Sequence, residues 1–276
     1  MFSPMLRHSA QLATDLSIGV SPRRAHSAGF AGQVGRSRAA SHVGQARLKR
    51  IHRLGRLGSV WREAPQRSPR LEPSYNLVGA GIDTTTTTVE WAMAELLHNP
   101  HMMARAKEEI EAVVGKDGTM EESHLLVLHY LDAVVKEVLR LHPVLPLLVP
   151  HRPSSTCTVA GYKIPEGTKV FINVWAIHRD PQFWEDASKF EPERFLSGGG
   201  CKVDYTGNSF HYLPFGAGRR ICPGVSLGEK MVKLILASLL HRIDWSLPDE
   251  VKLDLSEKFG IVMKKEQALV AVPTLQ

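Results

Sequence analysis

A short segment around one cysteine constrains the fold of this chain more than any other feature of the sequence. Its residues, FGAGRRICPG at 215–224, lead into an amphipathic pattern that predicts a helix over 223–241. Glycines at 216 and 218 let the backbone pass close to a flat or bulky group. Two arginines before Cys222, and the helix N-terminus after it, both favour the thiolate. The segment therefore predicts a sulfur that serves as a nucleophile or a metal ligand.

The residues alone leave several uses of this sulfur open. A lone cysteine before a helix is usually a small buried side chain. A catalytic thiol needs a histidine base nearby, for which His211 is a candidate. A structural zinc site is a weak alternative, because the cysteines at 157, 201 and 222 have no CxxC or HxxxH spacing. A haem iron needs a single axial thiolate, which enables it to cleave an O–O bond.

The cysteine segment is similar to the haem-binding loop of cytochrome P450 enzymes. Phe215, Gly218, Arg220, Cys222 and Gly224 match the family pattern F-x-x-G-x-R-x-C-x-G. At average residue usage these five positions coincide by chance less than about once in a million starting positions. The match therefore favours the haem ligand over the other uses of the sulfur.

Further motifs resemble the same family and stand in the family's order. They are AGIDT (80–84), similar to the oxygen-activation stretch of the long central helix, EVLR (137–140), similar to E-x-x-R, and PERF (192–195). Together with HRDP (178–181), DWSLP (244–248) and EKFGIVMKK (257–265), they make the chain similar to plant microsomal members of the geraniol-hydroxylase-like type. The resemblance covers about residues 76–276, the C-terminal part of a family member.

The resemblance implies heme b, iron protoporphyrin IX, as the cofactor, with Cys222 as the proximal iron ligand and the loop glycines beside it. It implies that Arg220 donates a charge-assisted hydrogen bond to a haem propionate. His151 falls where family members place a propionate-binding side chain, although a solvated loop histidine is an equal alternative. Phe215 is expected near the thiolate, where it limits access of water.

Asp83 and Thr84 form an acid–alcohol pair that the resemblance identifies as catalytic. In the family such a pair supplies protons during oxygen activation, which requires a donor within hydrogen-bond reach or one water away. Without the motif, the simpler alternatives are a solvated Asp83 and a Thr84 hydroxyl bonded to its own helix.

Glu137 and Arg140 lie three residues apart and therefore share one face of a helix. Alone, such a pair is usually a solvated ion pair of little energetic value. The resemblance instead implies a buried network with Arg194, which braces the haem loop and does no chemistry itself.

The remaining pattern predicts an α+β fold that is mainly α, as in the C-terminal part of the cytochrome P450 fold. We expect helices at 77–98, 100–114 and 122–141 (one or two there), each bounded by turn or proline signals. A hairpin is expected over 156–174 with its turn at 165–167, followed by a short helix near 181–186. Short strands are expected within 251–273.

The first quarter of the chain has a different composition. Residues 1–70 hold 13 of the 34 Lys and Arg but only 2 of the 28 Asp and Glu. This composition fits a disordered basic segment, an organellar targeting peptide or an aberrant start, and we assign residues 1–75 to it and 76–276 to the haem-binding portion. Nucleic-acid binding is disfavoured, since the segment has few aromatic residues and no recognisable module. The odd number of cysteines, 3, argues against a disulfide framework and for a reducing compartment.

The resemblance implies a monooxygenase that hydroxylates a lipophilic small molecule, terpenoid-like or another plant secondary metabolite, with O₂. The apolar segments 144–149 and 259–263 match segments that line substrate pockets in the family. Electrons are expected from NADPH through NADPH-cytochrome P450 reductase, with Arg219, Lys230 and Lys233 as candidate contacts.

Compared with full-length family members, the chain is expected to lack the membrane anchor, the proline hinge and the helices that form most of the distal pocket. Full-length members are expected at the cytosolic face of the endoplasmic reticulum membrane. Without the anchor, the location of this chain is expected to be cytoplasmic or is left unassigned. The alternative hypothesis is a truncated, non-catalytic fragment with weak or no haem binding, because lost apolar burial exceeds the small margin by which domains are stable.

Overall fold

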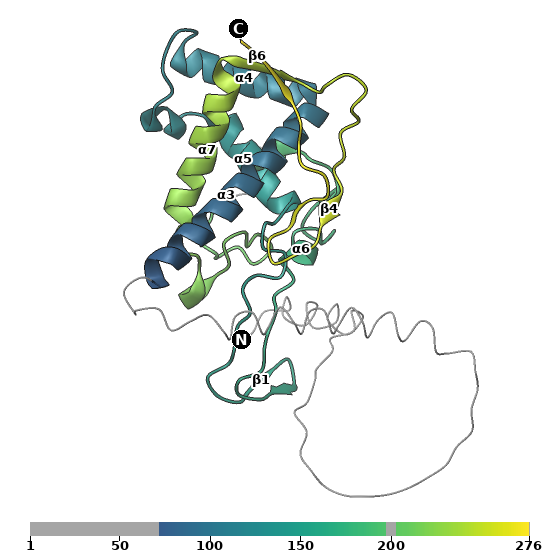
Figure 1. Ribbon diagram of the computed structural model, residues 1–276. Helices are drawn as coiled ribbons and strands as arrows, with labels where there is room; N and C mark the ends of the chain where they lie inside the picture. The colour runs from purple at the N-terminus through teal and green to yellow at the C-terminus, as the bar shows by residue number, and fades with distance from the viewer. Residues whose placement is uncertain (1–71, 197–202, 276) are drawn as a thin grey trace, which may run out of the picture. The chain divides into compact units, whose positions relative to one another are not determined.

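The computed structural model describes residues 72–196 and 203–275 (Figure 1). The basic segment 1–71 and Cys201 lie outside the described residues. The chain divides into two compact units. Tyr75–Ser155 and Glu166–Gln276 form the unit that carries the cysteine loop, and Thr156–Pro165 belongs to the other unit.

Two consecutive helices open the described part of the chain, as the sequence predicts. Helix α3 spans Glu72–His98 and α4 spans Pro100–Val114, with Asn99 between them and Pro100 in the first turn of α4. A proline at this position lacks an N–H that the helix start would leave unpaired in any case. The threonines 84–88 do not break α3. The hydroxyls of Thr84, Thr86 and Thr88 donate to carbonyls four residues earlier at 2.6, 2.9 and 2.8 Å, so they are satisfied within their own helix.

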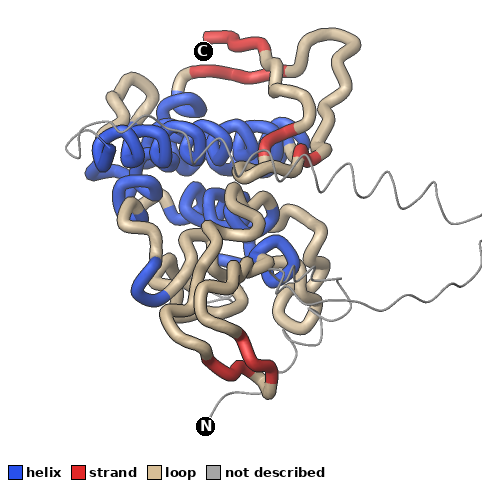
Figure 2. Tube along the Cα trace, turned by 60° about the horizontal axis from the view of Figure 1, so that its bottom comes forward, coloured by secondary structure: helices blue, strands red, loops and turns tan. Residues whose placement is uncertain are grey.

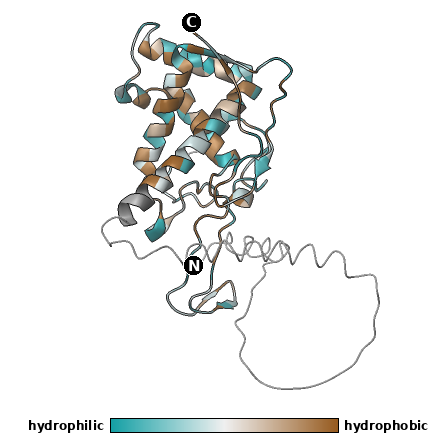
Figure 3. Cartoon of the chain, viewed as in Figure 1, coloured by the Kyte–Doolittle hydropathy of each residue, from teal (hydrophilic) through white to brown (hydrophobic). Residues whose placement is uncertain are grey.

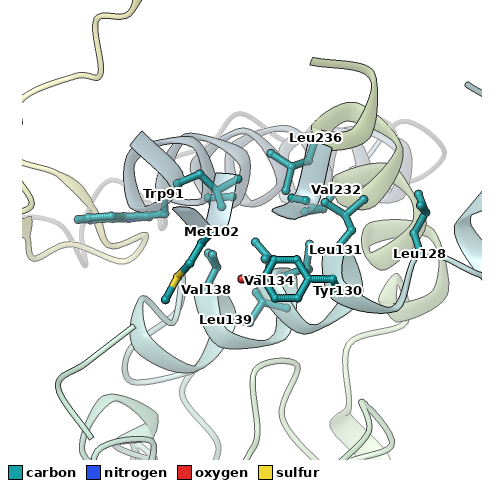
Figure 4. Close-up of a cluster of buried hydrophobic side chains, with 14 of the residues drawn as sticks. Trp91, Met102, Leu128, Tyr130, Leu131, Val134, Val138, Leu139, Val232 and Leu236 are labelled. Carbon is teal, nitrogen blue, oxygen red and sulfur yellow. The ribbon is translucent and has the colours of Figure 1, made fainter. Parts of the chain in front are cut away.

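Helices α5 (His129–Leu141) and α7 (Val225–His241) complete the helical layer, with the short 3₁₀ helix η1 (Glu122–Leu126) before α5. Both helices pack against α4 and against each other. Apolar residues recur along all four long helices (Figure 3). The core between them contains Trp91, Leu131, Val134, Val138 and Leu236, all fully buried (Figure 4). Burial of these side chains supplies the main force that holds the helices together.

Small two-stranded sheets flank the helices in the larger unit (Figure 2). Strand β3 (Ile243–Ser246) pairs antiparallel with β6 (Val272–Leu275), and β4 (Glu257–Lys258) pairs with β5 (Lys264–Lys265). The strands expected within 251–273 are therefore present but short, and their partner β3 was not predicted. Helix α6 is at Val174–Ile177, whereas the helix expected near 181–186 is a series of turns.

The hairpin of the other unit is shorter than predicted. Strand β1 (Cys157–Val159) pairs with β2 (Tyr162–Ile164), and Ala160 and Gly161 form the turn with φ of 49° and 86°. Two left-handed residues suit the twist of a two-residue hairpin turn. The hairpin turn is therefore at 160–161 and not at 165–167, although Glu166 and Gly167 do form a turn. In the larger unit, residues 168–174 form only an isolated bridge between His151 and Val170.

Across the described ranges, every helix falls short of the combined length and apolar character needed to cross a membrane.

Candidate functional site

The cysteine loop is a tight turn that presents its sulfur at the surface. Gly216 and Gly218 adopt left-handed φ of 75° and 64°, which side-chain-bearing residues rarely adopt. The short 3₁₀ helix η3 (Gly218–Arg220) follows, and the Cys222 N–H donates to the Phe215 carbonyl at 2.9 Å. This bond closes the loop, and the Cys222 side chain is exposed.

The surroundings of the loop differ from one residue to the next. A Cβ at Gly218 would meet no heavy atom within 4 Å, so the space beside its backbone is open. A Cβ at Gly224 would lie 3.7 Å from the Cys222 sulfur. The ring of Phe215, the first residue of the loop, lies edge-on to the Tyr205 ring at a centroid distance of 5.3 Å. The Gly218 backbone therefore faces open space, and Phe215, at the start of the loop, packs on an aromatic neighbour.

Gly207 packs directly against the backbone of the cysteine loop and was not among the predicted site residues. A Cβ at this position would lie 2.7 Å from the Gly216 carbonyl oxygen and 2.8 Å from the Ala217 Cα, closer than real Cβ contacts allow. Gly207 also has a positive φ of 74°. Its local sequence, YTGNS, reads only as a turn, so no local signal reveals this contact.

The structure brings Glu137, Arg140 and Arg194 together. Arg140 is fully buried and donates to both Glu137 carboxylate oxygens, at 2.6 and 2.7 Å. Arg194 Nε lies 3.2 Å from Glu137 Oε1. The remaining donors of the Arg140 guanidinium bond the carbonyls of three residues: His178 (2.8 Å), Ala187 (2.8 Å) and Lys189 (2.9 Å). The arrangement is a buried ion pair with its lone pairs and protons satisfied.

His178 lies beside this network and was not among the predicted site residues. Its ring is fully buried, with Nδ1 at 3.1 Å from the Arg140 carbonyl and Nε2 accepting from the Leu213 N–H at 2.8 Å. Burial, the largest cause, lowers the pKa of His178 to about 3 and outweighs the hydrogen bond to the Arg140 carbonyl. The imidazole is therefore neutral across the physiological range.

Asp83 and Thr84 are adjacent on α3 but are not joined by a hydrogen bond in the described part of the chain. The Thr84 hydroxyl donates to the Ala80 carbonyl at 2.6 Å, and the exposed Asp83 carboxylate lies 3.6 Å from Lys264 Nζ. The structure therefore shows both simpler alternatives: a Thr84 hydroxyl bonded to its own helix and an exposed Asp83 carboxylate. Neither contact prevents a water from bridging the two side chains, because a hydroxyl and a carboxylate keep further acceptor sites.

His151 has an unsatisfied ring nitrogen. Its backbone pairs with Val170 through two hydrogen bonds of 2.9 Å, which fix the residue. Its Nδ1 atom is buried and has no hydrogen-bond partner in the described part of the chain. A buried polar atom without a partner is costly, so an external polar group is a suitable partner here.

The three candidate docking cations differ sharply. Arg219 is exposed, and Lys230 is exposed and paired with Glu122 at 2.6 Å. Lys233 is buried and bonds Glu229 at 2.6 Å and Asp132 at 3.1 Å. Because its charge is already paired inside the fold, Lys233 is unsuited to contact another protein, and that expectation is wrong.

The two apolar segments expected at a substrate pocket lie side by side. The Met263 N–H donates to the Val144 carbonyl at 2.8 Å. A cavity of about 360 Å³ lies between the segments and the α6 region, lined by Pro146, Leu147, Asn173, Trp175, Glu257, Phe259 and Met263.

The remaining alternatives for the sulfur lack support in the described residues. The His211 ring stacks on Phe183 at 5.4 Å, and no hydrogen bond joins it to Cys222 within the described ranges. The described ranges also hold no cluster of three metal-ligating side chains. The residues do fit haem: the cysteine loop offers an exposed thiol and open space beside Gly218, and His151, in a separate segment, has an unpartnered nitrogen.

Residues 72–272 match the sequence model of the cytochrome P450 family, and the chain belongs to this family. It is 53% identical over 201 residues to cytochrome P450 76C2 of Arabidopsis thaliana, covering 72% of this chain and 39% of that protein. It is 47% identical to salviol synthase of Salvia pomifera, covering 73% and 40% of the two chains. The chain thus spans about two fifths of the length of these relatives.

A solved structure of a zebra fish cytochrome P450 with abiraterone has the same partial fold. It is 39% identical, with a TM-score of 0.64, and the match covers 72% of this chain and 45% of that one. The larger unit is therefore part of the cytochrome P450 fold, mainly helical with small sheets.

Proposed function

We propose that this chain is the haem-binding part of a monooxygenase that inserts one oxygen atom from O₂ into a lipophilic small molecule. The observation that carries the proposal is the cysteine loop, which is closed by the hydrogen bond from the Cys222 N–H to the Phe215 carbonyl at 2.9 Å and leaves Cys222 exposed. When bound there, the haem supplies oxygen activation, a chemistry that no side chain provides.

The chain's own residues would hold the cofactor and move protons. Cys222 would ligate the iron as a thiolate, and Arg220 and His151 would hold the propionates through charge-assisted hydrogen bonds. The Thr84 hydroxyl and the Asp83 carboxylate would pass protons through a bridging water. Glu137, Arg140 and Arg194 would brace the loop without touching substrate.

The substrate proposal rests on the relatives and on the apolar cavity. Names among the relatives include flavonoid 3'-monooxygenase of Petunia hybrida, 48% identical, and tabersonine 16-hydroxylase 1 of Catharanthus roseus, 46% identical. Such names favour a plant secondary metabolite, terpenoid-like or of another class. The mostly apolar side chains around the cavity beside Phe259 and Leu147 suit a ligand of that character.

Electrons would reach the haem from NADPH through NADPH-cytochrome P450 reductase. The exposed Arg219 and Lys230 remain candidate contacts near the cysteine loop, since exposed cations steer an acidic partner. For the full-length relatives this arrangement fits the cytosolic face of the endoplasmic reticulum.

The alternative, a chain that binds haem weakly by itself, is favoured by exposed apolar side chains. Val149, Phe259 and Ile261 are 65%, 66% and 68% exposed, as is Ile82 on α3 at 58%. Large exposed apolar side chains on neighbouring segments are typical of surfaces that another part of a fold covers.

Reduced-carbon-monoxide difference spectroscopy of the haem-loaded 276-residue chain tests the proposal. A Soret band at ~450 nm is expected for an intact thiolate ligand. Cys222→Ala should abolish this band, whereas the matched variant Cys157→Ala, in the other unit, should keep it. A wild-type chain that takes up no haem contradicts the proposal and favours the weakly binding alternative. A band that survives Cys222→Ala contradicts the assignment of Cys222 as the iron ligand.

A further inference from the structure

His178 forms the direct polar connection between the buried Arg140 and the chain that leads into the cysteine loop. The guanidinium of Arg140 donates to the His178 carbonyl at 2.8 Å. The His178 ring in turn contacts the Arg140 carbonyl through Nδ1 at 3.1 Å. On its other side the ring meets the Leu213 N–H through Nε2 at 2.8 Å.

These partners determine which ring nitrogen carries the proton. A carbonyl oxygen only accepts, so Nδ1 must donate to Arg140. A backbone N–H only donates, so Nε2 must be the bare nitrogen that accepts from Leu213. A ring with one proton satisfies both contacts, whereas an imidazolium would set Nε2–H against the Leu213 N–H. The ring is fully buried and stacks on Tyr212 at 5.4 Å, which fixes its plane.

Leu213 is where the connection enters the cysteine loop. Its carbonyl accepts from the Gly216 N–H at 3.1 Å, which makes the turn in which Gly216 has φ of 75°. The next carbonyl but one, on Phe215, accepts from the Cys222 N–H at 2.9 Å. A shift of the Leu213 backbone would therefore move the two turns that position the sulfur.

We propose that His178 is the positioning residue of the cysteine loop, holding the Leu213 backbone, and through it the Cys222 sulfur, in register with the Glu137–Arg140 pair. The inference rests on the proposed function only for its consequence at a haem; the contact itself is a property of the polypeptide. The Glu137–Arg140 pair and the cysteine loop are far apart in sequence. The single imidazole ring of His178 contacts both the Arg140 carbonyl and the Leu213 N–H.

Two substitutions separate the two contacts of the ring. In His178→Asn, the amide nitrogen lies where Nδ1 was and keeps the bond to the Arg140 carbonyl, but the side chain is too short to reach Leu213. In His178→Gln, the longer side chain places its amide oxygen near the Nε2 position and can accept from Leu213, while the Arg140 contact is lost. Both variants lose ring packing, so a purely structural role predicts similar effects.

Hydrogen–deuterium exchange of the full 276-residue chain without haem is the primary measurement. We expect His178→Asn to speed exchange in the peptide 209–222 by about tenfold or more, the size of one lost buried hydrogen bond, and His178→Gln by less than about twofold. Exchange of α4, at 100–114, should be unchanged in both and serves as the internal control. Equal acceleration of the loop in both variants, or in neither, overturns the proposal.

A measurement on the unaltered chain covers the case in which a variant does not fold. The ¹⁵N chemical shifts of the His178 ring report which nitrogen carries hydrogen, and we expect protonated Nδ1 and bare Nε2. A ring protonated on Nε2 overturns the assignment, because it could not accept from Leu213.

The consequence at the haem is tested separately. In haem-loaded chains, His178→Asn should lower the share of haem that absorbs at ~450 nm after reduction under carbon monoxide, and His178→Gln should restore it. If the variants show the expected exchange pattern but the haem-loaded wild-type chain shows no such band, the proposed function is contradicted and the positioning contact is supported. A band of equal share in all three chains overturns the positioning role.

Discussion

The His142 ring lies flat on the Trp91 indole, with centroids 3.8 Å apart and planes 4° from parallel. Each nitrogen of the same ring faces a carboxylate, Nε2 at 2.7 Å from Glu95 and Nδ1 at 3.0 Å from Glu257. The stack therefore joins α3, the end of α5 and β4 through one side chain. These contacts anchor the segments that lead into 144–149 and 259–263, the two expected walls of a substrate pocket.

Lower pH should destabilise the contacts around His142, because Glu257 becomes protonated. Burial, the largest single cause, raises the pKa of its carboxyl, but hydrogen bonds from His142 and Trp175 and the charge of Arg179 together lower the pKa below its ordinary value. A lowered folded-state pKa means that the carboxylate stabilises the fold above its unfolded pKa and that this contribution is lost as the pH falls through the folded value.

We therefore expect Glu257→Gln to lower the free energy of unfolding by about 1–3 kcal/mol near neutral pH, and by progressively less in acid. Urea unfolding at a series of pH values measures both. The control is Glu266→Gln, whose partner Lys258 forms an exposed pair at 3.2 Å and should contribute little. A difference between wild type and Glu257→Gln that does not change with pH contradicts the assignment.

Replacement of Arg140 by lysine should be severe although it keeps the charge. Lysine cannot reproduce the fork that bonds both Glu137 oxygens and the carbonyls of His178, Ala187 and Lys189. We expect Arg140→Lys to destabilise the chain by about 3–5 kcal/mol in urea unfolding. Lys189→Ala, which removes a largely exposed partner of Asp186, should have little effect on stability. Similar losses in both variants would show that Arg140 is not held as the contacts indicate.

His178 should give the chain a distinct pH dependence. Its folded-state pKa of about 3 lies below the ordinary 6.5, because burial and the nearby charges of Arg140 and Arg179 oppose protonation. The unfolded state therefore binds up to one more proton between these values, so the stability decreases as the pH falls, by about 1.4 kcal/mol per pH unit.

His178→Gln removes this titration, so the stability difference between wild type and variant should shrink as the pH falls from about 6.5 towards 4. Denaturation midpoints with a common denaturant slope provide the measurement. Parallel pH profiles would mean that the ring is not buried in neutral form.

The lysines on α7 should behave differently from each other. Lys233→Ala leaves Asp132 and Glu229 without their buried cation and should destabilise by about 1–3 kcal/mol. Lys230→Ala breaks an exposed pair with Glu122 and should change stability by less than about 1 kcal/mol. If either lysine contacts the reductase, only Lys230→Ala should weaken a salt-dependent association without loss of fold. A stable Lys233→Ala variant with weakened association contradicts this division.

The sequence by itself determined the family and the long helices. The spacing of Phe215, Gly218, Arg220, Cys222 and Gly224 is a local pattern, and so is the i, i+3 spacing of Glu137 and Arg140. Helix periodicity and proline boundaries are also local, which explains why the predicted helices at 100–114 and 223–241 agree closely with α4 and α7. Local physics was also sufficient for the threonines of α3, whose hydroxyls bond their own helix.

Only the tertiary structure decided which side chains serve the cysteine loop. His178 lies 35 residues from Leu213 in sequence, and its HRDP context gives no sign that its ring accepts a loop amide. Gly207 reads as an ordinary turn residue, and Lys233 reads as a surface cation until its buried partners are seen. The physical reason is that burial and hydrogen-bond partners are properties of contacts between distant segments, whereas sequence patterns record only what neighbours along the chain can satisfy.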